Sequence, residues 1–246
     1  MPSPTGARAE GTTWPRVVVV TARARLVGQA GVSLGAWPDL LLEQISGALD
    51  GGADLIQVRE SDLDAGALVR FLRRLFRELP DCSSRVVVND RVDIAWVTGA
   101  GGVHLTDRSI DLEDVRQLVS ADKKWVMGRS VHDPATAARS RSASYLLAGT
   151  VQASGSKPPD WRLLGWAGLR AVVGAAEGTP VVAIGGLGAA DVAAVLGAGA
   201  AGIAGIGCFL PQPGREVASS VQERVRAVRK AFDTTGGETY TRRAGQ

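Results

Sequence analysis

Aromatic residues and cysteine are scarce in this sequence, and no long hydrophobic run occurs. Phe, Trp and Tyr together make up 5% of the 246 residues, while Ala, Val, Leu and Gly are abundant. This composition suits parallel strands that are buried on both faces and packed against alanine-rich helices. The two cysteines, Cys82 and Cys208, lie far apart, and neither belongs to a CxxC pair. Their spacing argues against a disulfide framework and indicates a reducing cytoplasm.

The sequence also lacks the signals of secretion, of a membrane span and of nucleic-acid binding. The residues up to Arg16 have no apolar centre of a signal peptide, and the run Val17–Val20 is far too short to cross a bilayer. The arginines of Arg70–Arg74 fall on one face of a predicted helix, without aromatic residues in a stacking pattern. We therefore expect a soluble cytoplasmic protein with neither a membrane nor a nucleic-acid partner.

Short apolar runs and amphipathic stretches alternate eight times along the chain. The runs predict strands at Val17–Thr21, Leu55–Val58, Arg85–Val88, Gly102–Leu105, Trp125–Gly128, Ser144–Ala148, Val181–Ile184 and Gly202–Ile206. The stretches predict helices at Asp39–Asp50, Asp64–Glu78, Arg91–Thr98, Leu112–Ala121, Pro134–Arg141, Arg162–Gly174, Ala189–Gly197 and Gly214–Phe232. Eight such units in about 215 residues predict an α/β fold that closes into a (β/α)8 TIM barrel. An open doubly wound sheet is the alternative, although no GxGxxG motif follows the first strand.

A single barrel domain is expected over residues 14–233. The ends, Met1–Thr13 and Thr234–Gln246, are rich in Gly, Thr and Arg, and we predict that both are flexible. The sequence shows neither a linker nor an interface signature, so a homodimer stays open.

Polar residues and glycines follow nearly every predicted strand. In a TIM barrel, catalytic and binding residues lie at the carboxyl ends of the strands, so these positions would share one rim. They are Gln57, Arg59 and Glu60, Asn89 and Asp90, His104, Ser130 and His132, Gly185 and Gly186, and Ile206, Gly207 and Cys208. The sequence therefore predicts a substrate site at this rim.

The segment Gly149–Lys157 is a candidate anion site. It follows the sixth predicted strand and contains Ser154, Ser156 and Lys157 among small residues. Small residues let backbone N–H groups approach an anion, hydroxyls add donors, and lysine adds a positive charge. A phosphate or diphosphate is the predicted ligand, and a solvated surface loop is the alternative.

The last two strands end in further candidate phosphate-binding residues, namely Gly185 and Gly186, then Ile206 and Gly207. Many barrels bind phosphate with the loops after strands seven and eight, where backbone N–H groups face the ligand. For the two glycines, a tight turn that needs positive φ is the alternative interpretation.

The ends of the second and third strands leave two interpretations open. Asp90, directly after Asn89, suits either a helix cap or a metal ion that bridges a diphosphate. Gln57 and Arg59 lie two residues apart and point to the same side of their strand. If that side is the barrel interior, a buried arginine needs an anion, which favours ligand contact.

The two histidines, His104 and His132, both fall at strand ends. Imidazole titrates near neutral pH and suits proton transfer. We interpret His104 as structural. The candidate catalytic residues are His132, as an acid or base, and Ser130, which lies near it at the mouth. No Ser-His-Asp order and no zinc-ligand spacing can be made from these residues.

Six segments of the chain together resemble thiamine phosphate synthase and its TenI-type relatives. They are Gln57–Glu60, Val88–Ala95, Gly102–Leu105, Gly128–His132, Gly149–Lys157 and Ala183–Gly186. The resemblance runs from about Val17 to Leu210 and implies a (β/α)8 barrel that binds a thiazole phosphate, a small phosphorylated substrate.

The synthase branch joins that thiazole to a pyrimidine methyl diphosphate and expels diphosphate with the help of magnesium. The resemblance assigns the diphosphate to Ser154, Ser156 and Lys157, the metal end to Asn89 and Asp90, and the thiazole phosphate to Gly186. Two positions depart from the synthase pattern. Ser61 stands where the synthase has a lysine, and Ser109 stands where it has a magnesium-binding aspartate. Asp107 or Asp111 would replace that ligand only with a shifted loop.

TenI-type relatives lack the full diphosphate machinery. Some of them isomerise a thiazole carboxylate phosphate to its aromatic tautomer, a proton shift assigned to the histidine that matches His132. Because Ser61 and Ser109 weaken the case for diphosphate expulsion, the sequence favours a tautomerase of thiamine biosynthesis with no cofactor. In this interpretation Gln57 and Arg59 place the ring or its carboxylate. A synthase that uses Mg²⁺ is the first alternative, and a non-catalytic regulator that binds thiazole or thiamine phosphate is the second.

Overall fold

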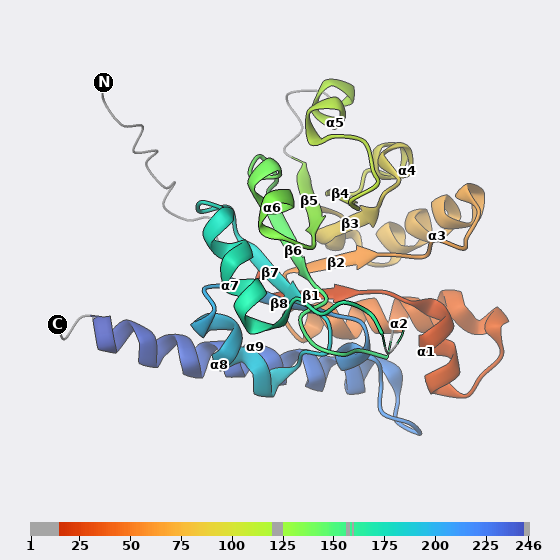
Figure 1. The fold of residues 1–246 in the computed structure, drawn as a ribbon. Coiled ribbons are helices and arrows are strands. Elements are labelled where there is room, and N and C mark those ends of the chain that lie inside the picture. The colour runs from red at the N-terminus through yellow and green to blue at the C-terminus, as the bar shows by residue number, and fades with distance from the viewer. Residues whose placement is uncertain (1–14, 120–124, 156–157, 159, 244–246) are drawn as a thin grey trace.

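Eight parallel strands close into a barrel in chain order, and helices cover its outside (Figure 1). The structure is a computed structural model that describes residues 15–119, 125–155, 158 and 160–243, with side chains up to residue 235. The strands are β1 (Val17–Val20), β2 (Leu55–Val58), β3 (Val86–Asn89), β4 (Gly102–Leu105), β5 (Val126–Val131), β6 (Tyr145–Gly149), β7 (Val181–Ile184) and β8 (Gly202–Gly205). The helices are α1 (Arg23–Ala30), α2 (Trp37–Asp50), α3 (Ala65–Glu78), α4 (Val92–Thr98), α5 (Leu112–Leu118), α6 (Pro134–Arg139), α7 (Gly165–Ala175), α8 (Val192–Gly197) and α9 (Val217–Arg243). The predicted (β/α)8 barrel is confirmed.

Two separate apolar layers hold the barrel together, because successive side chains of a strand point to opposite faces. Val18 and Val20 face the interior, where they pack in one cluster with Tyr145. Val17 and Val19 belong to the larger cluster between strands and helices. The same alternation decides which residues near the strand ends face the mouth of the barrel.

Several element boundaries differ from the sequence prediction, and three of the differences affect the rim or the end of the chain. Helix α1 was not predicted, because its eight residues include two arginines, a glutamine and a glycine and leave no clear apolar stripe. Strand β5 extends to Val131, so Ser130 lies inside the strand rather than after it. Helix α9 continues past Phe232 to Arg243 and thus covers most of the segment predicted as a tail. Residues 1–13 lie outside the described part. Within the described part, no helix is long and apolar enough to span a membrane.

Helices α2 and α9 pack side by side across the bottom of the view in Figure 1. Gly47 of α2 faces the backbone of Ala218 of α9 so closely that a Cβ on Gly47 would overlap the Ala218 carbonyl. This close approach lets the last helix close the outer layer where the chain returns to its first strand.

We predict that Gly47→Ala destabilises the fold by about 1–3 kcal/mol, because overpacking must push α9 outward. Gly174→Ala on α7 is the matched control, since a Cβ there meets no atom within 4 Å. The control should be neutral or slightly stabilising, because alanine favours helix over glycine. Urea denaturation of both variants measures the difference, and equal unfolding free energies would contradict this account of the α2–α9 contact.

Candidate active site at the carboxyl rim of the barrel

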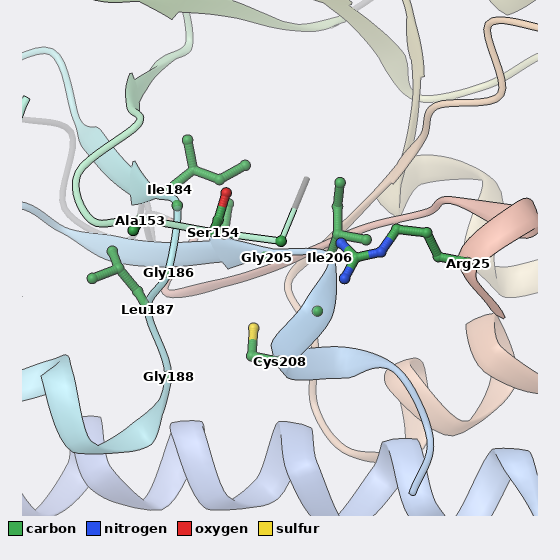
Figure 2. A pocket seen from close by; sticks show the side chains of 14 residues that line it. Arg25, Ala153, Ser154, Ile184, Gly186, Leu187, Gly188, Gly205, Ile206 and Cys208 are labelled. Carbon is green, nitrogen blue, oxygen red and sulfur yellow. The ribbon is translucent and has the colours of Figure 1, made fainter. Parts of the chain in front are cut away.

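A cavity of about 430 Å³ opens at the carboxyl ends of the last strands (Figure 2). Three loops and the start of α1 form its wall. The lining residues are Arg25, Ala153–Gly155, Ile184–Gly188 and Ala204–Cys208. Five residues predicted to bind phosphate therefore lie around one space: Ser154, Gly185, Gly186, Ile206 and Gly207. Ser156 and Lys157 of the same prediction fall outside the described residues.

The turn after β7 requires its two glycines. Gly185 and Gly186 have φ of 107° and 67°, in the region that residues with a Cβ rarely adopt. A Cβ on Gly185 would overlap the side chain of Thr150, and one on Gly186 would overlap the carbonyl of Ala153. The two interpretations of this motif are thus compatible, because the same tight turn forms one wall of the cavity.

Hydrogen bonds fasten the loop after β6 to the loop after β7. The backbone N–H of Gln152 donates to the Gly185 carbonyl at 3.0 Å, and its side-chain Nε2 donates to Asp191 Oδ1 at 3.0 Å. The other oxygen of Asp191 accepts the backbone N–H of Gly188 at 2.9 Å. Asp191 therefore holds both loops in place. It also occupies the backbone N–H of Gly188, which is then not available to an anion in the cavity.

Arg25 is a candidate binding residue that the sequence prediction missed. It is the charged side chain among the described lining residues, and its guanidinium extends across the cavity beside Ile206 (Figure 2). Its Nη2 lies 3.5 Å and 3.6 Å from the positions that a Cβ would take on Gly207 and Gly155. A half-buried guanidinium without a carboxylate partner among the described residues suits a phosphate. Inspecting the residues just after the first strand would have found it.

Glu60 fixes the helix that carries Arg25. Its buried carboxylate accepts the Thr21 hydroxyl at 2.6 Å and the backbone N–H of Arg23 at 3.0 Å, where α1 begins. Burial raises the pKa of Glu60, and these hydrogen bonds oppose that rise. Glu60 therefore has a structural role, because it holds the start of α1, the helix that carries Arg25.

Gln57 and Asn89 form a polar pair that faces the interior near the mouth. Gln57 is buried, and its Nε2 donates to Asn89 Oδ1 at 2.9 Å. Arg59 does not share this position, because the strand ends at Val58 and the side chain of Arg59 is exposed. Arg59 is therefore not in the barrel interior, so the condition under which a buried arginine would need an anion is not met, although an exposed Arg59 at the rim can still meet an anion.

Asp90 is held in a strained conformation and does not cap the next helix. Its φ is 64°, and α4 begins without a side-chain cap. Such strain at a carboxylate is typical of functional sites. The hydroxyl of Ser109 donates to Asp90 Oδ1, so the two positions that the resemblance assigns to the metal end lie side by side.

Neither predicted substitute for the missing metal ligand joins Asp90. Asp111 Oδ1 lies 3.9 Å from Arg129 Nη2, and Asp107 borders the same rim cavity as Arg129. Among the described residues, no three His, Cys, Asp or Glu side chains gather closely enough to hold a metal ion. Asp107 and Asp111 thus do not replace the ligand lost at Ser109, because both lie on the side of the loop that faces Arg129.

The two histidines have different environments. His132 is exposed, and its Nδ1 lies 2.6 Å from the carbonyl oxygen of Gly149. A carbonyl only accepts, so a neutral His132 carries its proton on Nδ1 and leaves a lone pair on Nε2. His104 is buried, and its Nε2 lies 2.9 Å from Ser130 Oγ. Burial lowers the pKa of His104 to about 3, with smaller contributions from the charges of Arg129 and Arg59, so this ring is neutral.

Cys208 lines the cavity of Figure 2 but is a poor nucleophile. Burial raises the pKa of its thiol to about 12, so the thiolate is scarce at neutral pH. Cys208 is therefore not a candidate for thiol chemistry at this site.

Comparisons with known proteins agree with this geometry. The model of the family described as thiamine monophosphate synthase matches residues 32–209. The chain belongs to the thiamine phosphate synthase/TenI family. A thiamine-phosphate synthase of Anaeromyxobacter dehalogenans is 39% identical over 171 residues, which cover 69% of this chain and 74% of that protein. A thiamine-phosphate synthase of Methanoregula boonei is 35% identical over 188 residues, covering 75% of this chain and 86% of that protein.

A solved structure supports the same assignment. Thiamine phosphate pyrophosphorylase from Pyrococcus furiosus superposes with a TM-score of 0.68 at 30% identity, covering 89% of this chain and 96% of the other. The chain is therefore an enzyme of the thiamine phosphate synthase/TenI family, whose members act on small phosphorylated substrates. These relatives are named for the synthase branch, whereas the sequence alone favoured the tautomerase.

The predicted site residues of this family member fall into two groups. Those on β6–β8 surround the cavity of Figure 2, and those on β2–β5 lie across the mouth. Because the barrel closes in chain order, β3 with Asn89 and Asp90 lies opposite β7 with Gly185 and Gly186. The predicted site residues thus form two separate groups on opposite sides of the mouth.

The residues around Asp90 fit the magnesium ion that the family implies. Mg²⁺ commonly binds one or two protein carboxylates and takes its other ligands from phosphate oxygens and water. Asp90 supplies one exposed carboxylate, and Ser109 supplies a hydroxyl beside it. This donor set suits an ion that a diphosphate carries into the site, and not an ion that the protein holds alone.

We predict that Arg25→Met weakens binding of thiazole phosphate by about 10–100-fold, the range expected for hydrogen bonds to a charged group. Binding of the unphosphorylated thiazole alcohol should not change, because the lost contact is to the phosphate. Arg170→Met, on the exposed face of α7, removes the same charge away from the cavity and is the control. Calorimetry with both ligands measures the effect, and an equal loss for phosphate and alcohol would contradict a phosphate contact.

Proposed function

We propose that the chain is a thiamine phosphate synthase, which joins a pyrimidine methyl diphosphate to a thiazole phosphate and releases diphosphate. The observation that carries this proposal is the pair of opposed anchors at the rim. A glycine-walled cavity lies at β7 and β8, and Asn89 and Asp90 lie opposite at β3. A reaction between two anionic substrates needs an anchor for each. Isomerisation of one thiazole carboxylate phosphate would use the cavity for its phosphate and Gln57 and Arg59 for its carboxylate, and would leave Asp90 without a task. The names of the relatives support the same branch.

The cavity between β7 and β8 would hold the thiazole phosphate. Gly186 and Gly207 bring bare backbone to its wall, and Arg25 adds a bidentate cation. The Gln57–Asn89 pair is an ordered polar surface for the rings, because each side chain fixes the other. These contacts place the two reactants before any bond changes, which removes much of the entropic cost of the reaction.

The chemical step exchanges one bond for another. The C–O bond between the methylene carbon of the pyrimidine and its diphosphate breaks, and the diphosphate leaves with the electron pair. The electron pair of the thiazole nitrogen then forms the new bond to that carbon. Negative charge develops on the leaving oxygen, so donors near it lower the barrier. Exposed Arg59 and Ser130 are the described residues that we assign to this task, whereas Ser154, which the resemblance assigns to the diphosphate, lines the cavity that we assign to the thiazole phosphate.

Magnesium, when bound with the substrate, would neutralise charge on the leaving diphosphate. Asp90 would bind that ion, and Ser109 would hold the Asp90 carboxylate in place through its hydrogen bond.

The tautomerase is the second candidate, and the geometry of His132 favours it. The hydrogen bond from Nδ1 to the Gly149 carbonyl fixes the ring and leaves Nε2 as a base at the rim. This histidine follows β5, and the loop after β6 begins at the carbonyl that it contacts. A proton shift on a thiazole carboxylate phosphate would use the β7–β8 cavity and His132, without Asp90.

An assay with both sets of substrates separates the two functions. We expect thiamine phosphate to form from pyrimidine diphosphate and thiazole phosphate in the presence of Mg²⁺. Asp90→Asn should lower that rate by about 100-fold or more, because the metal loses its charged ligand. Asp93→Asn removes a neighbouring carboxylate that is paired with Arg91, so it is the control and should have little effect.

The same preparation is tested for isomerisation of the thiazole carboxylate phosphate. If no thiamine phosphate forms, and isomerisation occurs and is lost in His132→Ala, the synthase proposal is rejected in favour of the tautomerase. Binding of thiazole phosphate without turnover in either assay would reject both enzymes and leave the regulator.

A further inference from the structure

Three adjacent strands place Tyr145, His104 and Ser130 in a hydrogen-bonded chain inside the barrel. Tyr145 on β6 contacts His104 Nδ1 at 2.9 Å, and His104 on β4 contacts Ser130 Oγ on β5 at 2.9 Å through Nε2. Gly128 of β5 pairs with both His104 and Tyr145 in the sheet. The hydrogen bonds thus run from Tyr145 on β6, past β5, to His104 on β4, and then back to Ser130 on β5 at the rim.

Gly128 makes this crossing possible. A Cβ at Gly128 would lie 2.5 Å from His104 Nδ1 and 2.6 Å from Tyr145 Cε1, which is far inside van der Waals contact. The missing side chain leaves the space in which the two rings meet, with their centroids 5.6 Å apart. The glycine of the Gly-Arg-Ser-Val-His segment therefore has a packing role that the sequence alone did not reveal.

The available hydrogen-bond partners decide which atom donates and which accepts in the Tyr145–His104 and His104–Ser130 hydrogen bonds. Tyr145 is 1% exposed, and burial raises the pKa of its hydroxyl, so the proton stays on the oxygen. Its hydroxyl has His104 Nδ1 as its partner within the described residues. If Nδ1 donated, the buried Tyr145 proton would have no acceptor, which is costly. Tyr145 therefore donates to Nδ1.

The neutral His104 ring then carries its proton on Nε2, because an imidazole that accepts at one nitrogen donates at the other. Nε2–H donates to Ser130 Oγ, so the hydroxyl proton of Ser130 must point away from His104. Ser130 lies at an inward position near the end of β5, and the exposed Arg59 follows β2 at the same rim. The guanidinium of Arg59 would favour an anionic acceptor for the Ser130 proton.

We propose that Tyr145 and His104 are positioning residues that fix Ser130 Oγ as a hydrogen-bond donor to an anionic oxygen of the bound substrate. In the synthase this oxygen belongs to the diphosphate, so that part of the inference rests on the proposed function. The assignment of donor and acceptor in the two hydrogen bonds rests on the buried contacts alone. His104, interpreted from the sequence as structural, is thereby connected to the candidate catalytic Ser130.

The tautomer of His104 is measured directly by nitrogen NMR of the full chain labelled at histidine. The sequence contains only His104 and His132, so a His132→Gln variant assigns both rings. We expect a protonated Nε2 and an unprotonated Nδ1 in His104 at neutral pH. A proton on Nδ1 would overturn the proposal, and this result does not depend on which reaction the enzyme catalyses.

Binding of inorganic diphosphate with Mg²⁺ tests whether Tyr145 and His104 act through Ser130. Tyr145→Phe should weaken this binding about tenfold, and Ser130→Ala should weaken it at least as much, because a hydrogen bond to a charged group is lost. The double variant should equal Ser130→Ala alone, since Tyr145 acts only through Ser130. Effects that multiply in the double variant would overturn the proposal, even if the tautomer is as expected.

Ser220→Ala is the control for a merely structural effect. Ser220 is buried on α9, and its Oγ accepts the backbone N–H of Gln212, so the variant loses one buried hydrogen bond of a residue that does not line the cavity of Figure 2. It should lower stability without changing diphosphate affinity or the His104 signals. If Tyr145→Phe behaves like Ser220→Ala in both readouts, Tyr145 has no positioning role.

Discussion

The closure of β8 onto β1 is the contact on which the site depends. Val19 pairs with Gly205, so the loop after the last strand lies beside the loop after the first. This pairing places Arg25 of α1 next to Gly207 and completes the wall that the β6 and β7 loops begin. An open sheet would leave these segments at opposite edges and would have no cavity between them.

The alternation of side chains along each strand then assigns the residues to their tasks. Inward positions near the strand ends carry Gln57, Asn89 and Ser130, and outward positions carry the apolar residues that hold the helices. Because β3 and β7 lie opposite in the closed barrel, the two groups of residues that we propose as anion sites are separated by the mouth. Substrate charge, and not shape alone, would orient the two reactants across the mouth.

Much of this arrangement could be predicted from the sequence. Valine-rich runs with regular spacing gave the eight strands, and glycines and polar residues after those runs gave most of the rim. Helix α1 and Arg25 were not predicted, because a short helix with two arginines has no apolar periodicity. The direction in which Asp107, Asp111 and Arg59 point depends on loop geometry and on strand ends, which a pattern of residue types does not determine. The role of Gly128 depends on its neighbours in the sheet, which lie far away in the sequence.

The central claim is that the glycine-walled cavity between β7 and β8 anchors the thiazole phosphate. A crystal structure of the chain with thiazole phosphate tests it most directly. We expect the phosphate beside Gly186 and Gly207, with the Arg25 guanidinium within hydrogen-bond distance of its oxygens. A phosphate bound instead at Asn89 and Asp90, with the cavity of Figure 2 filled by solvent, would contradict the claim.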